Sequence, residues 1–351
     1  MTEPAFVVER GTRTSRVGAV AGAVVLLMLA ALPLWGTRSL MRMLVEFISL
    51  LVLAQMWNLL AGYAGLVSIG QQAYVGLGGY ALIVLADDLG VDPFASVFLA
   101  GLVAAAFSVP TAALVFRFRG GYFAVGTWTV AEVYRLLIAN SPRLGRGSGR
   151  TLAAVFPLAP DTREALTYWL ALLIGTGAII HSYLHLRSRF GLSLTAIRDS
   201  EPASESLGID VFRTKLCVYI IASFGAGLTG ALIYLNLLRI SPDAAFTVNW
   251  TAFMIFIVVI GGIGTIEGPI VGTLVFFLLR EFLADFGAWY LILLGVVAVL
   301  VMLRYPQGLW GLIADRWDVR FFPVQRRVRF GAAPAGEADA DRSAGLTSGA
   351  T

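Results

Sequence analysis

The side chains that could perform chemistry are few, and they form no catalytic group. His181 and His185, the only histidines, lie four residues apart, so one helix face could present both to a zinc ion. No glutamate follows the first histidine as in the H-E-x-x-H pattern of zinc enzymes, which favours a polar interfacial pair over a metal site. The single cysteine, Cys217, excludes an intrachain disulfide and lies in an apolar run, which predicts a packed core residue. The sequence therefore predicts no catalytic residue and no metal, and it disfavours a membrane-embedded enzyme.

One charged pair lies within an otherwise apolar stretch. Glu132 and Arg135 are three residues apart, so on a helix they share a face and can neutralise each other. An ionisable residue at membrane depth is first a functional hypothesis. Here an intramembrane ion pair that stabilises the helix bundle is the favoured interpretation.

Two glycine-rich blocks, residues 62–80 and 261–272, carry polar residues inside apolar surroundings. Close packing of helices through small residues is one interpretation. It leaves the polar side chains at membrane depth unexplained, because irregular backbone and uncompensated polar groups are tolerated there only in protein or beside water. We therefore predict broken helices that line a translocation pathway, with packing alone as the alternative. The predicted pathway residues are Ser68, Gly70, Gln71, Gln72, Gly262, Gly264 and Glu267.

Composition places all these residues in a membrane protein. Hydrophobic residues make up 58% of the 351 positions, charged residues 14%, and the mean hydropathy is +0.80. Soluble domains are less apolar and carry about 25% charged residues. The apolar runs are continuous and do not alternate with polar residues, which favours helices over a barrel. No basic and aromatic cluster of the kind that binds nucleic acid is present.

The apolar runs predict an all-α polytopic fold with about ten transmembrane helices. Because five is odd, two five-helix halves would have opposite orientations, and the glycine blocks fall near the third helix of each half. This placement suggests an inverted five-plus-five repeat with broken helices at the transport site. The predicted spans are 17–36, 40–60, 64–86, 94–116, 121–140, 165–186, 214–238, 249–266, 268–286 and 287–304.

The arginines orient these spans. Arg10, Arg13 and Arg16 precede the first span, which places a short N-terminal segment, residues 1–16, in the cytoplasm as the flank of an anchor. Both termini are then cytoplasmic, around a transmembrane domain over 17–313. The tail, residues 314–351, is predicted to be cytoplasmic and disordered. The loop 141–150 is an exception, because it carries three arginines and yet falls on the external side.

A charged cytoplasmic segment is predicted to contain a helix at about 193–208. Asp199 or Ser200 can cap it, Pro202 suits its first turn, and Gly208 can end it. A protein partner is favoured over lipid headgroups, because the segment is rich in acidic residues. The chain has one lysine, Lys215, and no G-x-x-x-x-G-K-[ST] motif, so ATP energy must come from another chain. The predicted coupling residues are Arg198, Asp199, Glu201, Ala203, Glu205, Leu207 and Gly208.

Several separated motifs resemble the permease subunits of branched-chain amino acid ABC importers, of the LivM-like branch, over most of residues 40–313. They are Trp57-Asn58-Leu59-Leu60-Ala61-Gly62-Tyr63-Ala64-Gly65 with Ser68-Ile69-Gly70, Arg119-Gly120-Gly121-Tyr122-Phe123-Ala124, Ala131-Glu132-Val133-Tyr134-Arg135, Ala196-Ile197-Arg198-Asp199 through Leu207-Gly208-Ile209, and Gly261-Gly262-Ile263-Gly264 through Gly268-Pro269. The family often has a Gly-His-Ala-Ala-like stretch where this chain has Gly70-Gln71-Gln72-Ala73.

The resemblance implies a function and a set of partners. The chain would translocate branched-chain or related small amino acids across a bacterial inner membrane. It would work with a second, LivH-like permease, two cytoplasmic ATPase subunits and an extracytoplasmic binding protein, in the lipid bilayer and without nucleic acid. This chain would bind no cofactor, and ATP would sit on the partner ATPase. The alternatives are a permease for urea or short amides, and a secondary transporter that works without an ATPase.

Overall fold

The computed structural model describes residues 6–9, 13–283, 289–305, 307–317, 321–322 and 327–330. The end of the predicted tail, residues 331–351, lies outside these ranges. Within them the chain is almost entirely helical. Two small antiparallel ladders complete it, β1 (Phe6–Glu9) with β4 (Arg327–Phe330) and β2 (Arg150–Thr151) with β3 (Arg239–Ile240).

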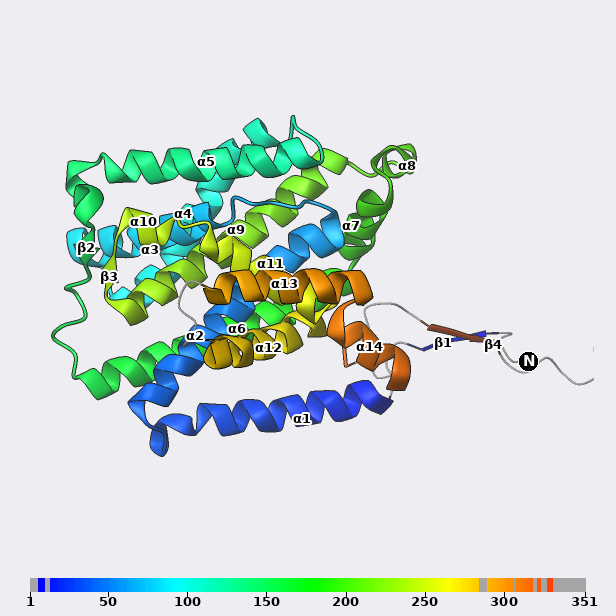
Figure 1. Cartoon of the computed structure of the whole chain (residues 1–351), viewed down its shortest axis with the longest axis horizontal. Helices are drawn as coiled ribbons and strands as arrows, with labels where there is room; N and C mark the ends of the chain where they lie inside the picture. The colour runs from blue at the N-terminus through cyan, green and yellow to red at the C-terminus, as the bar shows by residue number, and fades with distance from the viewer. Residues whose placement is uncertain are drawn as a thin grey trace, which may run out of the picture.

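The longer helices run in opposite directions along one bundle, and four short helices lie at its two ends (Figure 1). The longer ones are α1 (Arg13–Ala30), α2 (Arg38–Asn58), α3 (Gln72–Ile83), α4 (Pro93–Val115), α5 (Gly121–Ala139), α6 (Pro160–Arg187), α9 (Val211–Leu237), α11 (Asn249–Gly261), α12 (Glu267–Leu283) and α13 (Trp289–Arg304). The short ones are α7 (Arg189–Asp199), α8 (Glu201–Ser206), α10 (Pro242–Ala245) and α14 (Gly308–Trp317).

Each predicted span overlaps one of the longer helices, but residues 65–71 of the third span and 262–266 of the eighth are not helical. Ten membrane crossings stay a prediction. In the described part of the chain, seven helical segments are long and apolar enough to cross a membrane by themselves. The other three are α3, α5 and α12. Two of these are short, with 12 residues in α3 and 17 in α12. In α5, Glu132 and Arg135 lower the mean hydropathy.

Both predicted helix breaks are present. α2 continues into a π-helical turn (Leu59–Tyr63), and the chain then runs without helical structure through residues 65–71, the first break, before α3 begins. Residues 262–266, the second break, separate α11 from α12. Gly262 and Gly264 there have φ values of +133° and +76°, which residues with a side chain rarely adopt.

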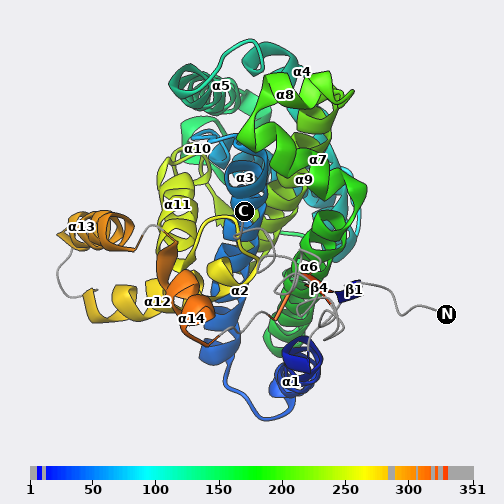
Figure 2. The ribbon, with the colours of Figure 1, turned by 90° about the vertical axis from the view of Figure 1, so that its right-hand side faces the viewer.

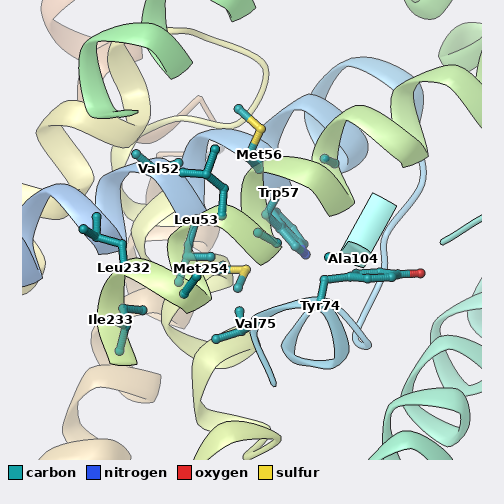
Figure 3. Close-up of a cluster of buried hydrophobic side chains, with 14 of the residues drawn as sticks. Val52, Leu53, Met56, Trp57, Tyr74, Val75, Ala104, Leu232, Ile233 and Met254 are labelled. Carbon is teal, nitrogen blue, oxygen red and sulfur yellow. The ribbon is translucent and has the colours of Figure 1, made fainter. Parts of the chain in front are cut away.

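The centre of the bundle is α3, which is buried almost all round and packs on α4 and α9 (Figure 2). Side chains from α2, α3, α4, α9 and α11 meet in one apolar core, in which Leu53, Val75 and Leu232 are fully buried (Figure 3). The Tyr74 hydroxyl donates to that of Tyr219 at 3.0 Å, so the two buried hydroxyls on α3 and α9 are paired.

Glycines allow this close approach. A Cβ atom at Gly78 would lie 1.9 Å from the carbonyl oxygen of Gly227, and one at Gly230 would lie 2.1 Å from that of Val75. α3 and α9 therefore touch backbone to backbone. The packing interpretation thus accounts for several glycines of the first block, while the breaks account for others.

We expect Gly78→Ala to lower thermal stability in detergent, because the new methyl group must separate α3 from α9. Overpacking of this kind costs about 1–3 kcal/mol. Gly177→Ala on α6 is the matched control, since a Cβ there meets nothing within 4 Å. Equal melting temperatures for the two variants would contradict the predicted tight contact.

Candidate functional site

The two breaks meet at one side chain, Asn58. Its Nδ2 donates to the Thr265 carbonyl oxygen at 2.7 Å, and its Oδ1 accepts from the Gly264 N–H at 2.8 Å. Asn58 is fully buried at the last turn of α2, and a Cβ at Gly62 would lie 2.3 Å from its Oδ1 and 2.7 Å from the Gly264 nitrogen. The amide of Asn58 thus joins the end of α2, which leads into the first break, to the second break, and Gly62 leaves the room for this.

A short helix at one end of the bundle reaches the same place. Arg198, near the end of α7, donates from Nη1 to the Gly62 carbonyl oxygen at 2.9 Å. Its aliphatic carbons lie beside Gly65, where a Cβ would be 3.3 Å from Cγ, and its Nη1 would be 3.6 Å from a Cβ at Gly264. Arg198 is one of the predicted coupling residues, and the structure turns its guanidinium inward, against both breaks.

The polar residues of the first break are buried within the subunit. Ser68, Gln71 and Gln72 are each at most 1% exposed. The Trp57 indole donates to the Ser68 carbonyl oxygen at 2.8 Å, and the Gln72 side chain accepts from the Thr251 hydroxyl on α11. Neither amide atom of Gln71 has a hydrogen-bond partner in the described chain. The Gln72 side chain and the Ser68 carbonyl thus connect this part of the chain to its neighbours, and a pathway role for the three polar residues stays a prediction.

Glu267 opens α12 directly after the second break. Its Oε1 accepts from the Phe322 N–H at 2.8 Å, so this carboxylate contacts the chain beyond α14. Gly308 is packed against the same break, since a Cβ there would lie 2.4 Å from the Gly262 Cα. The C-terminal segment therefore covers the second break from one side.

The predicted single helix at about 193–208 is two helices. Residues up to Asp199 belong to α7, Ser200 is extended with φ −162°, and α8 follows. Pro202 explains the division, because its ring would clash with the preceding turn of a continuous helix and it has no N–H to donate. Ser200 caps α8 by accepting from the Ala203 N–H, as the sequence indicated.

α8 is fixed to the bundle but leaves a side chain exposed. Glu201 forms an ion pair with Lys215 on α9, and Asp199 pairs with Arg198 at 3.0 Å. Leu207 is 78% exposed, and Gly208 ends the segment with φ +81°. The segment is therefore held to the bundle at Glu201 and exposed at Leu207.

The predicted pair Glu132 and Arg135 is in contact, at 2.6 Å, and Arg135 also contacts Asp243 at 2.6 Å. The pair is partly exposed at the surface of α5, with half of the Glu132 side chain accessible, and is not enclosed within the bundle. Asp243 is the member that sequence reasoning missed, because it lies more than 100 residues away on α10.

The three-arginine loop is held in place by the acidic residues of another loop. Arg150 contacts Asp88 at 2.6 Å, and Asp87 accepts from the backbone N–H of Ala153 and Ala154. The Arg150 guanidinium holds the pKa of Asp88 below its usual range. β2 and β3 lie at the end of the bundle opposite to α7 and α8 (Figure 1).

The histidines and the cysteine form no centre for chemistry. The rings of His181 and His185 are tilted to each other with centroids 4.1 Å apart, and no group of three metal-ligating side chains occurs in the described ranges. Cys217 is exposed on α9, so the prediction of a packed core residue was wrong. An apolar run marks a membrane span but does not tell which of its faces is turned to lipid.

The fold is a multi-pass helical bundle in which two helix breaks lie side by side, next to a short helix at one end. Such an arrangement is typical of membrane transport proteins. Residues 39–302 match the model of the family described as the branched-chain amino acid transport system permease component, and the chain belongs to that family. No solved structure matches it.

Relatives in this family carry transport names. The chain is 29% identical over 278 residues to the high-affinity branched-chain amino acid transport system permease protein LivM of Escherichia coli (strain K12). That match covers 72% of this chain and 65% of the relative, just under two thirds of its length. The chain is 24% identical over 258 residues to a probable branched-chain amino acid transport permease protein LivM of Methanocaldococcus jannaschii, covering 69% and 71%. It is also 27% identical over 156 residues to the fructose import permease protein FruG of Bifidobacterium longum, covering 41% and 45%.

We expect Asn58→Ala to lower the melting temperature, because it leaves the Thr265 carbonyl and the Gly264 N–H without their partner. A buried group left unsatisfied in this way costs about 1–3 kcal/mol. Asn140→Ala is the control, since Asn140 is exposed and bonds only within its own helix turn. If the two variants melt together in detergent, Asn58 does not hold the breaks.

Proposed function

We propose that this chain is the membrane-spanning permease subunit of an ATP-driven importer for branched-chain or related small amino acids. The observation that carries the proposal is the contact of Arg198 with the Gly62 carbonyl oxygen. The same side chain also lies beside Gly65 and Gly264, so a short helix at one end of the bundle is in contact with both helix breaks. The family to which the chain belongs supplies the substrate class.

The proposed topology has ten spans in two inverted halves, α1–α5 and α6, α9, α11, α12 and α13. Repeated contacts support it. In the first half, α3 packs on α4 and α5, and it also packs on α9 of the second half. Its counterpart α11 packs in the same way on α12 and α13, and on α2 of the first half. Likewise, α4 contacts α9, and its counterpart α12 contacts α2. The first helices, α1 and α6, depart from this pattern by packing on each other. The breaks flank the third helices, since the first precedes α3 and the second follows α11. Broken helices at the interface of two repeats are the expected position of a transport site.

The proposed assembly follows from this topology. ATPase subunits would dock at α7 and α8 on the cytoplasmic side of a bacterial inner membrane, where both termini also lie. ATP would be held by those subunits, since this chain has no phosphate-binding loop. A second permease would complete the pathway, and an extracytoplasmic binding protein would deliver the amino acid at the opposite end.

The mechanism uses the inward-turned arginine. Closure of the ATPase pair moves α8 and α7, and Arg198 transmits the movement to the Gly62 carbonyl. Because Asn58 couples Gly264 to the same helix end, the two breaks move together. Such a rigid connection suits a rocking transition between two packed states.

We expect Arg198→Ala to lower amino acid uptake by the reconstituted complex about tenfold or more, since a hydrogen bond from a charged donor is worth about 1.5–3 kcal/mol. The ATPase subunits should still co-purify. Arg189→Ala, at an exposed position of the same helix, is the control. Uptake at the wild-type rate by the Arg198 variant would refute the proposed transmission.

The docking role of α8 has its own test. Leu207→Asp and Glu205→Arg should abolish transport and ATPase association while membrane insertion stays normal, because a buried charge or a reversed charge disfavours an interface. Both side chains are exposed, so the fold of the subunit should not change. Pull-down of the ATPase and uptake are measured together, and unaltered association would exclude α8 as the docking element.

A further inference from the structure

The first break exposes one of its two faces. Gly65 is exposed, Val67 is 47% exposed and Ile69 is half-buried, whereas Leu66 and Ser68 between them are 7% and 0% exposed. Exposed and buried residues thus alternate along this segment, so it has one exposed and one buried face. None of the three residues on this exposed face belongs to the set that the sequence predicted for the pathway.

This exposed face lies at membrane depth. The Ser68 carbonyl is level with Trp57, six residues before the end of the π turn at Tyr63, and the Ile69 N–H donates to Thr127, six residues into α5. At 1.5 Å per residue, both positions are about 9 Å inside the helix ends. Val67 and Ile69 thus lie below the end of the bundle that carries α7, whereas Gly65 lies beside Arg198 at that end.

Part of the backbone of this face is not satisfied by the subunit, although the Ile69 N–H donates to the Thr127 hydroxyl. Neither the N–H nor the C=O group of Val67 forms a hydrogen bond with the described residues. Lipid cannot satisfy such groups, so irregular backbone at this depth is stable only when protein covers it or when it lines a watery cavity. The face of residues 65, 67 and 69 is therefore not a lipid-facing surface.

Its chemistry combines free backbone dipoles with aliphatic side chains. Val67 and Ile69 supply branched apolar groups, and no ionised side chain occurs in residues 65–71. The second break contributes a similar residue, Ile263, which is 43% exposed and precedes Gly264 beside Gly62. Unwound backbone can hold the charged ends of a small zwitterion, while branched side chains hold an apolar one.

We infer that the face formed by Gly65, Val67 and Ile69 is the cargo-contacting wall of this subunit and that it takes an amino acid with an aliphatic side chain. The inference rests on the proposed importer function. It assigns Gln72 and the Ser68 backbone to fastening the break from behind, and it assigns selectivity to the alternate residues.

Cysteine labelling tests the wall. In the full complex in liposomes, with Cys217→Ser to remove the exposed natural thiol, Val67→Cys and Ile69→Cys should react with a water-soluble thiosulfonate. Leucine at about 10 mM, a concentration above the usual range of Michaelis constants, should protect them. Leu66→Cys and Ser68→Cys are buried controls, and Val133→Cys is a lipid-facing control with the same 47% exposure as Val67. Absence of labelling at 67 and 69, or labelling that leucine does not slow, would overturn the inference.

Uptake supplies a second readout. Val67→Thr keeps the shape but adds a hydroxyl, and we expect kcat/KM for leucine to fall about tenfold while alanine is less affected, because apolar pockets discriminate by contact with the side chain. Val133→Thr should behave as the wild type. An equal effect of both substitutions would contradict a role in selectivity. If the wild-type complex takes up no leucine, the proposed function is wrong. The labelling of cysteines at positions 67 and 69 then still shows whether water reaches this face.

Discussion

The structure depends on one carboxamide that is hydrogen-bonded at both of its ends. Asn58 donates to the Thr265 carbonyl and accepts from the Gly264 N–H, at the point where α2 stops being an α-helix. Within a membrane, a broken helix exposes backbone groups that lipid cannot satisfy, so each break needs a partner inside the protein. Asn58 lies at the end of α2, shortly before the first break, and its side chain hydrogen-bonds two backbone groups of the second break. Two costly irregularities therefore stabilise each other, and they must lie side by side.

This constraint also explains the arrangement around it. α3 begins only after the extended segment, so it is short, and its glycines bring it against α9 closely enough to be buried on nearly all sides. Arg198 then satisfies the Gly62 carbonyl, which the π turn directs toward α7. A helix at one end of the bundle is thereby hydrogen-bonded to its least regular part. Movement at that end has a direct physical connection to the residues that cargo would pass.

Much of the architecture could be predicted from hydropathy. All ten predicted spans overlap helices, and both breaks fall in the glycine blocks, because apolar length and glycine act locally along the chain. The capping of α8 by Ser200 was also foreseen, since a cap needs only its own next turn. The division of the 193–208 helix was missed, although Pro202 was a signal for it. The exposure of Cys217 could not be foreseen, because hydropathy alone does not distinguish the faces of a membrane helix.

The amino-acid sequence by itself determined the membrane environment, the placement of helices, and the two points where helices break. The tertiary structure decided which residues serve at those points. Ser68, Gln71 and Gln72 have the polar character of a pathway, yet they are buried, whereas Val67 and Ile69 point outward from the same extended backbone. The pairing of Asn58 with residues more than 200 positions away was likewise invisible in the sequence. The physical reason is that polarity is a property of a residue, but exposure and hydrogen bonding depend on neighbours that only the folded chain brings together.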